Sequence, residues 1–166
     1  MNMFLSPRLT NLLRAVFSRS NPEDLELAVP WARSADLAYW FSRSAWSMAI
    51  IARWRKRISP KAPVVMWVPD YFCNQSLVKV REAGVTLVFY PVSSNRNPDW
   101  KKCNELAAQS PPDIFLAVHY FGIKCDSDTI RSFCNGYKSI IIEDCAHVLL
   151  PQKGIGTMGD FIFYSP

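Results

Sequence analysis

The feature that most constrains the fold is a regular alternation of apolar runs and helical patterns between residues 64 and 164. Five short, mainly apolar runs are predicted to form strands buried on both faces: 64–68, 85–90, 114–118, 139–142 and 161–164. Helical patterns occupy 74–83, 100–109 and 126–134, the last with Asp126 or Ser127 as its N-cap. Strands that alternate with helices of about ten residues form parallel β-α-β units. The sequence therefore predicts an α/β fold with a sandwiched, mainly parallel sheet.

The N-terminal part of the chain carries two further helical patterns. In residues 1–22, leucines and other apolar residues recur at helical spacing, which predicts a helical leader. Residues 44–57 form the second pattern, whose last turn is basic and suits a helix C-terminus. Four apolar residues of this second helix share one face: Trp46, Ile50, Ile51 and Trp54. The rest of the chain has the size of one domain, which we place at 23–166.

Composition narrows the function classes. The net charge of +5 is mild, and no strand interleaves basic with aromatic residues, so we expect no nucleic-acid partner. No apolar stretch approaches the roughly 20 residues of a membrane span. The cysteines show neither a C-x-x-C pair nor a Cys/His ligand spacing, which indicates reduced, mostly buried thiols of a cytoplasmic protein and no metal site. They are Cys73, Cys103, Cys125, Cys134 and Cys145.

Two acids and a histidine follow the apolar run at 139–142. Ligands bind at the carboxyl ends of the strands in such sheets, so we expect Glu143 and Asp144 at the ligand edge. Asp144 and His147 are three residues apart, and one turn of chain brings both within reach of one ligand. The spacing alone leaves four alternatives open: a metal site without an evident third ligand, a catalytic acid/base pair, a clamp for a cofactor, or a carboxylate that caps local amides beside a hydrogen-bonded histidine.

Two segments of small residues are candidates to face an anion. Ser42 and Ser44 lie where the helix at 44–57 begins, and they either cap it or leave its free N–H groups to an anion. The stretch KGIGTMGD at 153–160 is rich in glycine. It leads into a strand and lacks the Lys-Ser/Thr of a phosphate-binding loop, so we interpret it as a turn.

Several motifs occur in a fixed order along the chain: Pro69-Asp70-Tyr71-Phe72, Val118-His119-Tyr120-Phe121-Gly122, Glu143-Asp144-Cys145-Ala146-His147 and Gly156-Thr157-Met158-Gly159-Asp160-Phe161. Together with the small residues at the helix start, this ordered set resembles the DegT/DnrJ/EryC1/StrS family of sugar aminotransferases that depend on pyridoxal 5′-phosphate (PLP). The resemblance runs from residue 38 to the end of the chain. It implies the large domain of the fold-type-I PLP enzymes in incomplete form, because the chain covers well under half of a complete member.

The resemblance implies a role in PLP binding for each matching residue. Asp144 matches the aspartate that pairs with the pyridine nitrogen and keeps it protonated, so that the ring can accept electrons. His147 matches the residue that lies against the ring near its phenolic oxygen, and Phe72 matches the aromatic residue that stacks on the ring. The residues that match the phosphate site are Ser44, Ala45 and Ser165.

Departures from the family pattern bear on activity. Arg43 stands where the family often has glycine, and Cys73 stands where an aromatic residue is common. The family's Schiff-base lysine comes a few residues after the position of Ser165, beyond Pro166, and the small C-terminal domain is also missing. We therefore assign no catalytic residue and expect the chain as written to be inactive.

The resemblance also implies partners. A complete member moves an amino group from a donor such as glutamate to a keto-sugar carried on a nucleotide, in the biosynthesis of polysaccharides or glycosides. Members of the family are dimers with shared active sites, so the resemblance implies a homodimer. The alternative hypothesis is a non-catalytic protein, either a truncated remnant or an interaction domain that binds PLP or a nucleotide.

Overall fold

The computed structural model describes three stretches of the chain, residues 27–32, 37–59 and 63–165. The chain divides into two compact units at Tyr39, and each is considered by itself. The described part of the first unit holds a short helical turn, and the leader predicted for residues 1–22 lies outside the described residues. The second unit contains the sheet, its helices and all the residues predicted to bind PLP.

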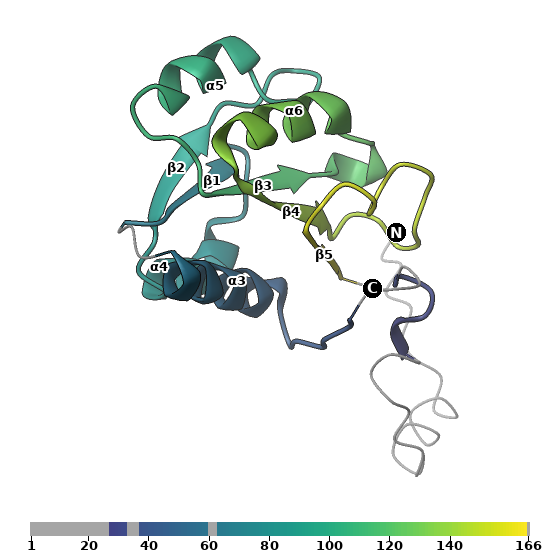
Figure 1. Ribbon diagram of the computed structural model, residues 1–166. Coiled ribbons are helices and arrows are strands. Elements are labelled where there is room, and N and C mark those ends of the chain that lie inside the picture. The colour runs from purple at the N-terminus through teal and green to yellow at the C-terminus, as the bar shows by residue number, and fades with distance from the viewer. Residues whose placement is uncertain (1–26, 33–36, 60–62, 166) are drawn as a thin grey trace, which may run out of the picture. The chain divides into compact units, whose positions relative to one another are not determined.

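The centre of the second unit is one five-stranded sheet in the order β2-β1-β3-β4-β5 (Figure 1). Its strands are β1 (Val65–Pro69), β2 (Thr86–Tyr90), β3 (Ile114–Val118), β4 (Ile140–Cys145) and β5 (Phe161–Tyr164). All neighbouring strands are parallel, which confirms the predicted sheet. The largest difference from the sequence prediction is in β4, which continues for three residues beyond 142 and so includes both acids.

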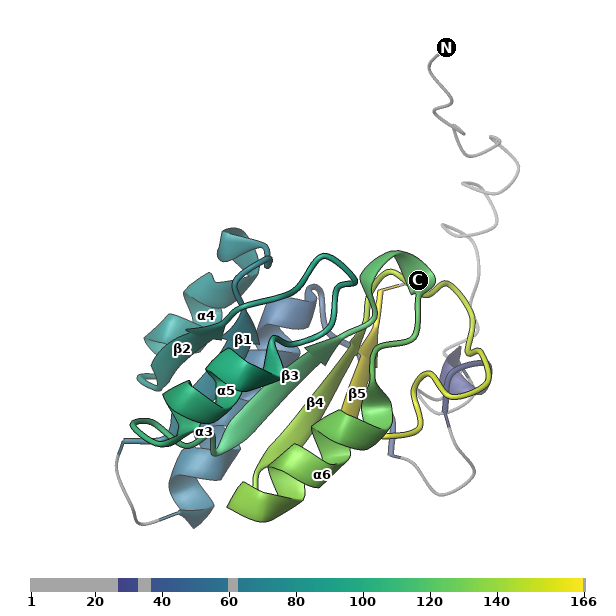
Figure 2. The same cartoon turned by 90° about the horizontal axis from the view of Figure 1, so that it is seen from above.

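Helices cover both faces of this sheet (Figures 1 and 2). The described helical segments are α3 (Ser44–Ile58), η1 (Asn74–Leu77), α4 (Val78–Glu82), α5 (Trp100–Ala107), η2 (Tyr120–Gly122) and α6 (Ser127–Tyr137). The direction of travel along the sheet reverses after β2, so right-handed crossovers place α4 on one face and α5 and α6 on the other. Helix α3 lies on the same face as α4.

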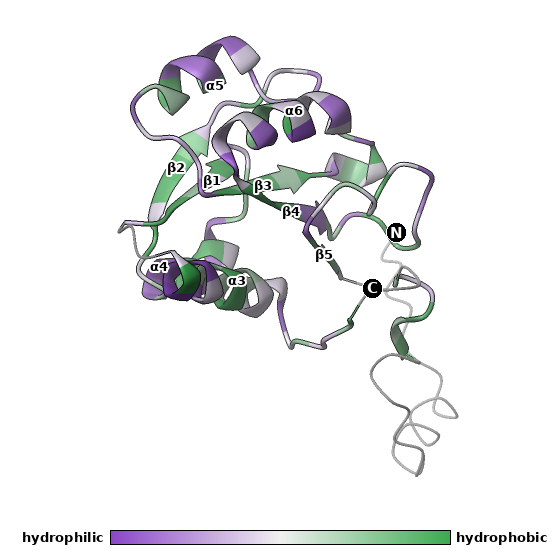
Figure 3. Ribbon diagram, viewed as in Figure 1, coloured by the Kyte–Doolittle hydropathy of each residue, from purple (hydrophilic) through white to green (hydrophobic). Residues whose placement is uncertain are grey.

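The core has one large hydrophobic cluster on each face, and successive strand residues alternate between them; a smaller third cluster consists of Cys145, Val148 and Ile155. Ile142 belongs to the cluster under α3 and α4, and Ile141 belongs to the cluster under α5 and α6. The strands are hydrophobic along most of their length, whereas β4 ends in a hydrophilic stretch (Figure 3). The same alternation directs the side chain of Asp144 to the α3/α4 face and that of Glu143 to the α5/α6 face.

Helix α3 packs on the sheet through a side other than the one that carries its largest apolar residues. Its buried side is made mainly of small residues and Met48, which allow a close approach to the sheet. Of the four residues predicted to share a face, only Ile51 is buried, while Trp46, Ile50 and Trp54 remain 38–47% exposed. The shared face of the sequence pattern is thus not the side of α3 that contacts the core, apart from Ile51.

The ends of two helices test the capping predictions. Asp126 caps α6, since its carboxylate accepts the N–H of Thr129, as predicted. The N-cap of α3 is Arg43, and among the described residues no side chain caps that helix, so neither Ser42 nor Ser44 has the capping role that the sequence left open.

The cysteines and the helix lengths complete the description. All five cysteines are free thiols; Cys73 is exposed and the others are buried. Within the described ranges, no helix combines the length and the apolar character needed to cross a bilayer.

Candidate functional site

The residues predicted to bind PLP lie along the carboxyl edge of the sheet. Phe72 follows the end of β1, Asp144 is the fifth residue of β4, His147 follows β4, and Ser165 follows β5. Because the strands are parallel, all these positions belong to one edge. The strand register places Asp144 between Val118 of β3 and Phe163 of β5.

The start of α3 reaches the same edge. Trp54 contacts Phe161 at the beginning of β5, with ring centroids 5.4 Å apart. Ser44 precedes Trp54 by ten residues, which is about 15 Å of helix, and β5 spans a similar length. Figure 1 shows that α3 begins on the side where the strand arrows end. The first N–H groups of α3, at Ser44 and Ala45, therefore lie near the level of Ser165, at a helix end without a side-chain cap.

Asp144 is a buried carboxyl group with few partners. It is 6% exposed, and its Oδ1 accepts the N–H of Ala146 at 2.9 Å. Among the described residues, no cationic side chain forms an ion pair with it. Burial raises the pKa of Asp144 to about 6, although the hydrogen bond from Ala146 opposes the shift. The charge of His119 also lowers this pKa, but burial outweighs both effects, so the described residues compensate the carboxylate only in part.

His147 is exposed and is held by the loop after β3. Its Nδ1 accepts the N–H of Phe121 at 3.1 Å, and the two rings stack with centroids 5.4 Å apart. Phe121 has a φ of 56°, a left-handed conformation that is uncommon for a bulky residue. Because Nδ1 is the acceptor, the neutral ring carries its proton on Nε2.

Phe72 is half-buried and packs against the hydrophobic cluster of the α3/α4 face, the face to which Asp144 points. The loop that carries it is tied to the end of β3, because the hydroxyl of Tyr120 donates to the carbonyl of Tyr71. Burial raises the pKa of Tyr120 well above its usual value, so this hydroxyl stays protonated and remains a donor. The neighbouring thiol of Cys73 is exposed, and hydrogen bonds from Ser76 lower its pKa.

Glu143 has a role that the sequence analysis missed. It is fully buried, and Oε1 accepts Nε2–H of His119 and the N–H of Gly156, each at 2.7 Å. Oε2 accepts the N–H groups of Met158 at 2.9 Å and Gly159 at 2.7 Å. Burial raises its pKa, but the hydrogen bonds from His119 and the loop amides outweigh burial, so the pKa is lowered overall and the group is ionised.

The segment 153–160, here called the glycine loop, fits closely around this carboxylate. A Cβ on Gly159 would lie 2.5 Å from the carbonyl oxygen of Phe161 and 2.7 Å from Cβ of Glu143. Gly156 has a φ of 71°, and its Cβ would meet the hydroxyl of Tyr164. The predicted turn is therefore a loop that closes on a buried side chain. The sequence contained a signal for this arrangement. Glu143 is two residues from the apolar position 141, and spaced glycines follow it at 154, 156 and 159.

One group of side chains has the composition of a metal site. Ligand atoms of His119, Glu143 and Cys145 lie within 4.8 Å of one another, and all three residues are buried. The oxygens of Glu143 already accept four N–H groups, and Nδ1 of His119 accepts the N–H of Cys125 at 3.2 Å. Burial also raises the pKa of Cys145, which keeps it a neutral thiol. The donor set is saturated by the protein itself and does not fit a metal ion.

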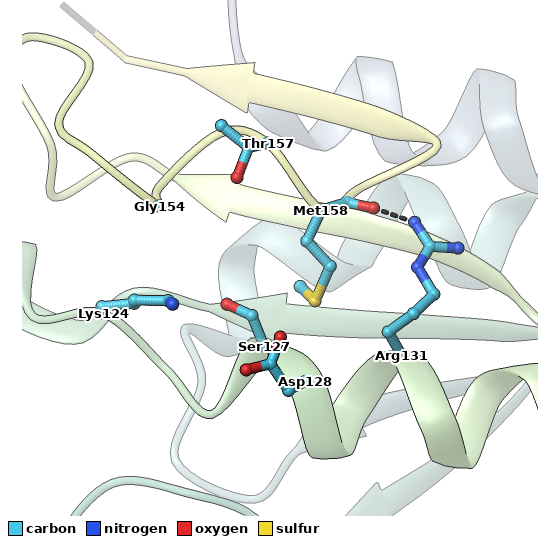
Figure 4. A pocket seen from close by; sticks show the side chains of 7 residues that line it. All are labelled: Lys124, Ser127, Asp128, Arg131, Gly154, Thr157 and Met158. Atoms are coloured by element: carbon cyan, nitrogen blue, oxygen red, sulfur yellow. Dashed lines mark hydrogen bonds between the residues drawn. The ribbon is translucent and has the colours of Figure 1, made fainter.

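A pocket on the α5/α6 face lies between the start of α6 and the glycine loop (Figure 4). It is lined by Lys124, Ser127, Asp128, Arg131, Gly154, Thr157 and Met158. Arg131 donates to the carbonyl of Met158 and pairs with Asp160 at 3.5 Å, so it holds the glycine loop from outside. None of the residues predicted to bind PLP lines this pocket.

The geometry bears on the alternatives that the spacing left open. Both carboxylate oxygens of Glu143 accept backbone N–H groups, so this residue caps local amides. Only one oxygen of Asp144 does so, by accepting the N–H of Ala146. The structure shows no hydrogen bond between the side chains of Asp144 and His147; the first accepts from Ala146, and Nδ1 of the second accepts from Phe121.

Comparison with known proteins gives the family. The profile of the DegT/DnrJ/EryC1/StrS aminotransferase family matches residues 55–165. GDP-perosamine synthase of Vibrio cholerae is 36% identical over 53 residues, which cover 30% of this chain and 14% of that protein. The family match spans all five strands of the sheet.

Two solved structures show the same fold. Escherichia coli GDP-4-keto-6-deoxy-D-mannose-3-dehydratase, solved with bound hydrated PLP, superposes on this chain with a TM-score of 0.62 and a sequence identity of 16%. The superposition includes 80% of this chain and 34% of the dehydratase. Helicobacter pylori PseC, an aminotransferase involved in the biosynthesis of pseudoaminic acid, superposes with a TM-score of 0.54 and a sequence identity of 17%. That superposition includes 66% of this chain and 29% of PseC. The chain thus spans about a third or less of the relatives that it matches. Because the family profile covers well over half of the sequence, the chain belongs to the DegT/DnrJ/EryC1/StrS aminotransferase family.

Proposed function

We propose that the carboxyl edge of the sheet, on its α3/α4 face, binds PLP as part of an aminotransferase that acts on nucleotide-linked keto-sugars. The observation that supports this most is Asp144, a buried carboxyl group at the end of a central strand that forms no ion pair with any described side chain. Family membership and the similarity to GDP-perosamine synthase support the reaction class and the nucleotide-sugar substrate.

The residues fit the two polar ends of the cofactor. A protonated pyridine nitrogen is the type of cation that Asp144 lacks, and pairing with it would lower the pKa of the carboxyl group. The phosphate would be bound by the uncapped N–H groups of Ser44 and Ala45 and by the hydroxyl of Ser165. A helix N-terminus favours an anion through its free N–H groups and its dipole, and α3 has no acidic residue in its first turn.

The flat part of the cofactor would be bound by two rings. Phe72 packs on the α3/α4 cluster and supplies an apolar surface, and His147 presents an imidazole whose Nε2–H remains available. Hydrogen bonds hold the loops that carry these rings, from Tyr120 to Tyr71 and from Phe121 to His147. Both rings are therefore oriented before any ligand arrives.

PLP supplies an electron-withdrawing ring that stabilises negative charge on a substrate carbon. The proposed part of this chain is to bind that ring and to keep a proton on its nitrogen through Asp144. His147 would donate its Nε2–H to an oxygen acceptor, and the backbone at the start of α3 would fix the phosphate. The amino donor and the nucleotide-sugar are proposed as partners of the complete protein.

The test is a binding titration with pyridoxamine phosphate, which has no aldehyde and so cannot condense with surface lysines. We expect Asp144→Ala to weaken binding by about tenfold or more, since a hydrogen bond to a charged group is lost. The matched control is Asp128→Asn, an exposed carboxylate on α6. Equal affinity of Asp144→Ala and the parent protein would show that the assignment of this site is wrong.

A further inference from the structure

The α5/α6 face of β4 carries a continuous hydrogen-bonded network behind the proposed cofactor site. Its centre is the Glu143 carboxylate, which accepts Nε2–H of His119 and three backbone N–H groups of the glycine loop. Both side chains are fully buried. The Glu143 carboxylate bonds to the glycine loop and to His119 at once. A movement of the loop or of His119 would therefore break hydrogen bonds to this carboxylate.

His119 extends this network to the residues of the proposed site. Its Nδ1 accepts the N–H of Cys125, which fixes the far end of the loop after β3. Its backbone N–H donates to the carbonyl of Asp144 at 3.0 Å. Two residues further along, the N–H of Phe121 donates to Nδ1 of His147. The orientation of His119 therefore determines the position of the backbone that bonds to both Asp144 and His147.

We propose that Glu143 and His119 are a positioning pair, which holds the glycine loop and the loop after β3 so that Asp144 and His147 are correctly placed for the cofactor. The role of the pair in binding rests on the proposed function. Neither side chain reaches the ligand in this arrangement, because both lie on the α5/α6 face while Asp144 points to the α3/α4 face.

The chemistry of the pair explains why a carboxylate and an imidazole are used. Four N–H donors converge on Glu143, and an ionised carboxylate accepts all four, whereas an amide would direct its own NH₂ group at some of them. His119 faces an acceptor on one side and a donor on the other, since Nε2 lies against Glu143 and Nδ1 accepts the N–H of Cys125. Burial lowers the pKa of His119, but its hydrogen bonds with Cys125 and Glu143 raise it overall to about 9, so the Glu143 carboxylate also stabilises the protonated ring. Replacing Glu143 by glutamine conserves the shape and removes this match.

The sequence offers a direct readout, because His119 and His147 are its two histidines. We would record the ring-nitrogen NMR signals of both in the parent, Glu143→Gln, His119→Gln and the control Glu105→Gln, an exposed residue of α5. Amide hydrogen exchange would be measured on the same samples, and circular dichroism would verify that each variant is folded. Pyridoxamine phosphate would then be titrated into each sample.

We expect Glu143→Gln to raise exchange at Gly156 and Gly159 by about tenfold or more, since hydrogen bonds to a charged acceptor weaken. The His147 ring should no longer occupy a single tautomer, because the hydrogen bond from Phe121 to its Nδ1 is weakened. Pyridoxamine phosphate should bind several-fold more weakly. His119→Gln should disturb His147 in the same way, whereas Glu105→Gln should match the parent. His119→Gln also serves as the second variant if Glu143→Gln does not fold.

The proposal is overturned if the His147 signals of the folded variants stay as in the parent, because the pair would then support the fold without positioning the site. The proposed function fails separately, if the parent protein does not bind pyridoxamine phosphate at all. In that case a disturbed His147 in the variants would still establish the positioning role, since the NMR and exchange readouts need no ligand.

Discussion

Two neighbouring carboxylates at the end of β4 have opposite environments. Glu143 faces the α5/α6 side, is fully buried and accepts four N–H groups, so its pKa is lowered. Asp144 faces the α3/α4 side, is almost as deeply buried and accepts one N–H group, and its pKa is raised to about 6. One residue step along a strand changes the face, and with the face it changes the number of donors.

The difference separates a structural acid from one that is available to a ligand. A buried charge is tolerated when hydrogen bonds replace its lost hydration, which is the situation of Glu143. Asp144 lacks these partners, so the ionised form destabilises the folded protein until a cation arrives. Sites that bind charged ligands often retain such an uncompensated group at the expense of stability. The following predictions test this contrast, beginning with the largest expected effect.

Removal of the structural acid should have the largest effect. Glu143→Ala leaves the N–H groups of His119, Gly156, Met158 and Gly159 buried without an acceptor, and we expect the free energy of unfolding to fall by about 3 to 5 kcal/mol. Urea denaturation of the parent and the variant measures this loss. In the control Glu105→Ala, at an exposed position, the change should stay within about 0.5 kcal/mol. A loss of that small size in Glu143→Ala would show that its hydrogen bonds contribute little.

Neutralising the other acid should act in the opposite direction and depend on pH. The raised pKa of Asp144 means that the folded protein holds its proton more tightly than the unfolded chain does. The free energy of unfolding therefore falls as the pH rises from about 4 to about 6. We expect Asp144→Asn to stabilise the protein by at most about 3 kcal/mol at pH 7.5.

The same variant provides its own control at low pH. Near pH 3.5 the carboxyl group of Asp144 is mostly protonated in both the folded and the unfolded protein, so Asp144→Asn and the parent should have nearly equal stability. Thermal unfolding across this pH range checks both expectations. If the stability difference were the same at both pH values, burial would not be the cause of the effect.

A glycine pair offers a smaller test of how the loop closes on Glu143. Gly159→Ala places a methyl group against Glu143 and the carbonyl of Phe161, and we expect it to lower the free energy of unfolding by about 1 to 3 kcal/mol. Gly136 in α6 has no neighbouring atom within 4 Å of the Cβ position, so Gly136→Ala should stabilise by about 0.5 to 1 kcal/mol. Equal effects of the two substitutions would show that the loop does not pack tightly on the carboxylate.

The sequence predicted those parts of the structure that depend on local patterns. The strand at 114–118 and the strand at 161–164 have the predicted bounds, because continuous apolar runs between polar segments leave little freedom. The cap at Asp126 was also predictable, since its carboxylate bonds only three residues away. The carboxyl edge followed from the parallel order of the strands, and so did the placement of Asp144 on it.

Other parts depend on contacts between distant residues and were beyond the sequence. The buried face of α3 is the side with small residues, because the distance between helix and sheet selects it over the bulkier side that carries Trp46 and Trp54. The bond between Glu143 and His119 joins residues 24 positions apart. The two adjacent acids looked equivalent in the sequence, and only the donors that the glycine loop and His119 supply distinguish them.

The central claim is that Asp144 is the acid available to a ligand and Glu143 the structural one, and a carbon-13 NMR titration of the two carboxyl groups tests it most directly. The account predicts that Asp144 titrates near pH 6 in the free protein and at a lower pH once pyridoxamine phosphate is added. Glu143 should remain ionised throughout that range. The account would be contradicted if Asp144 titrated at the ordinary value for an aspartate and its titration did not change on addition of the ligand.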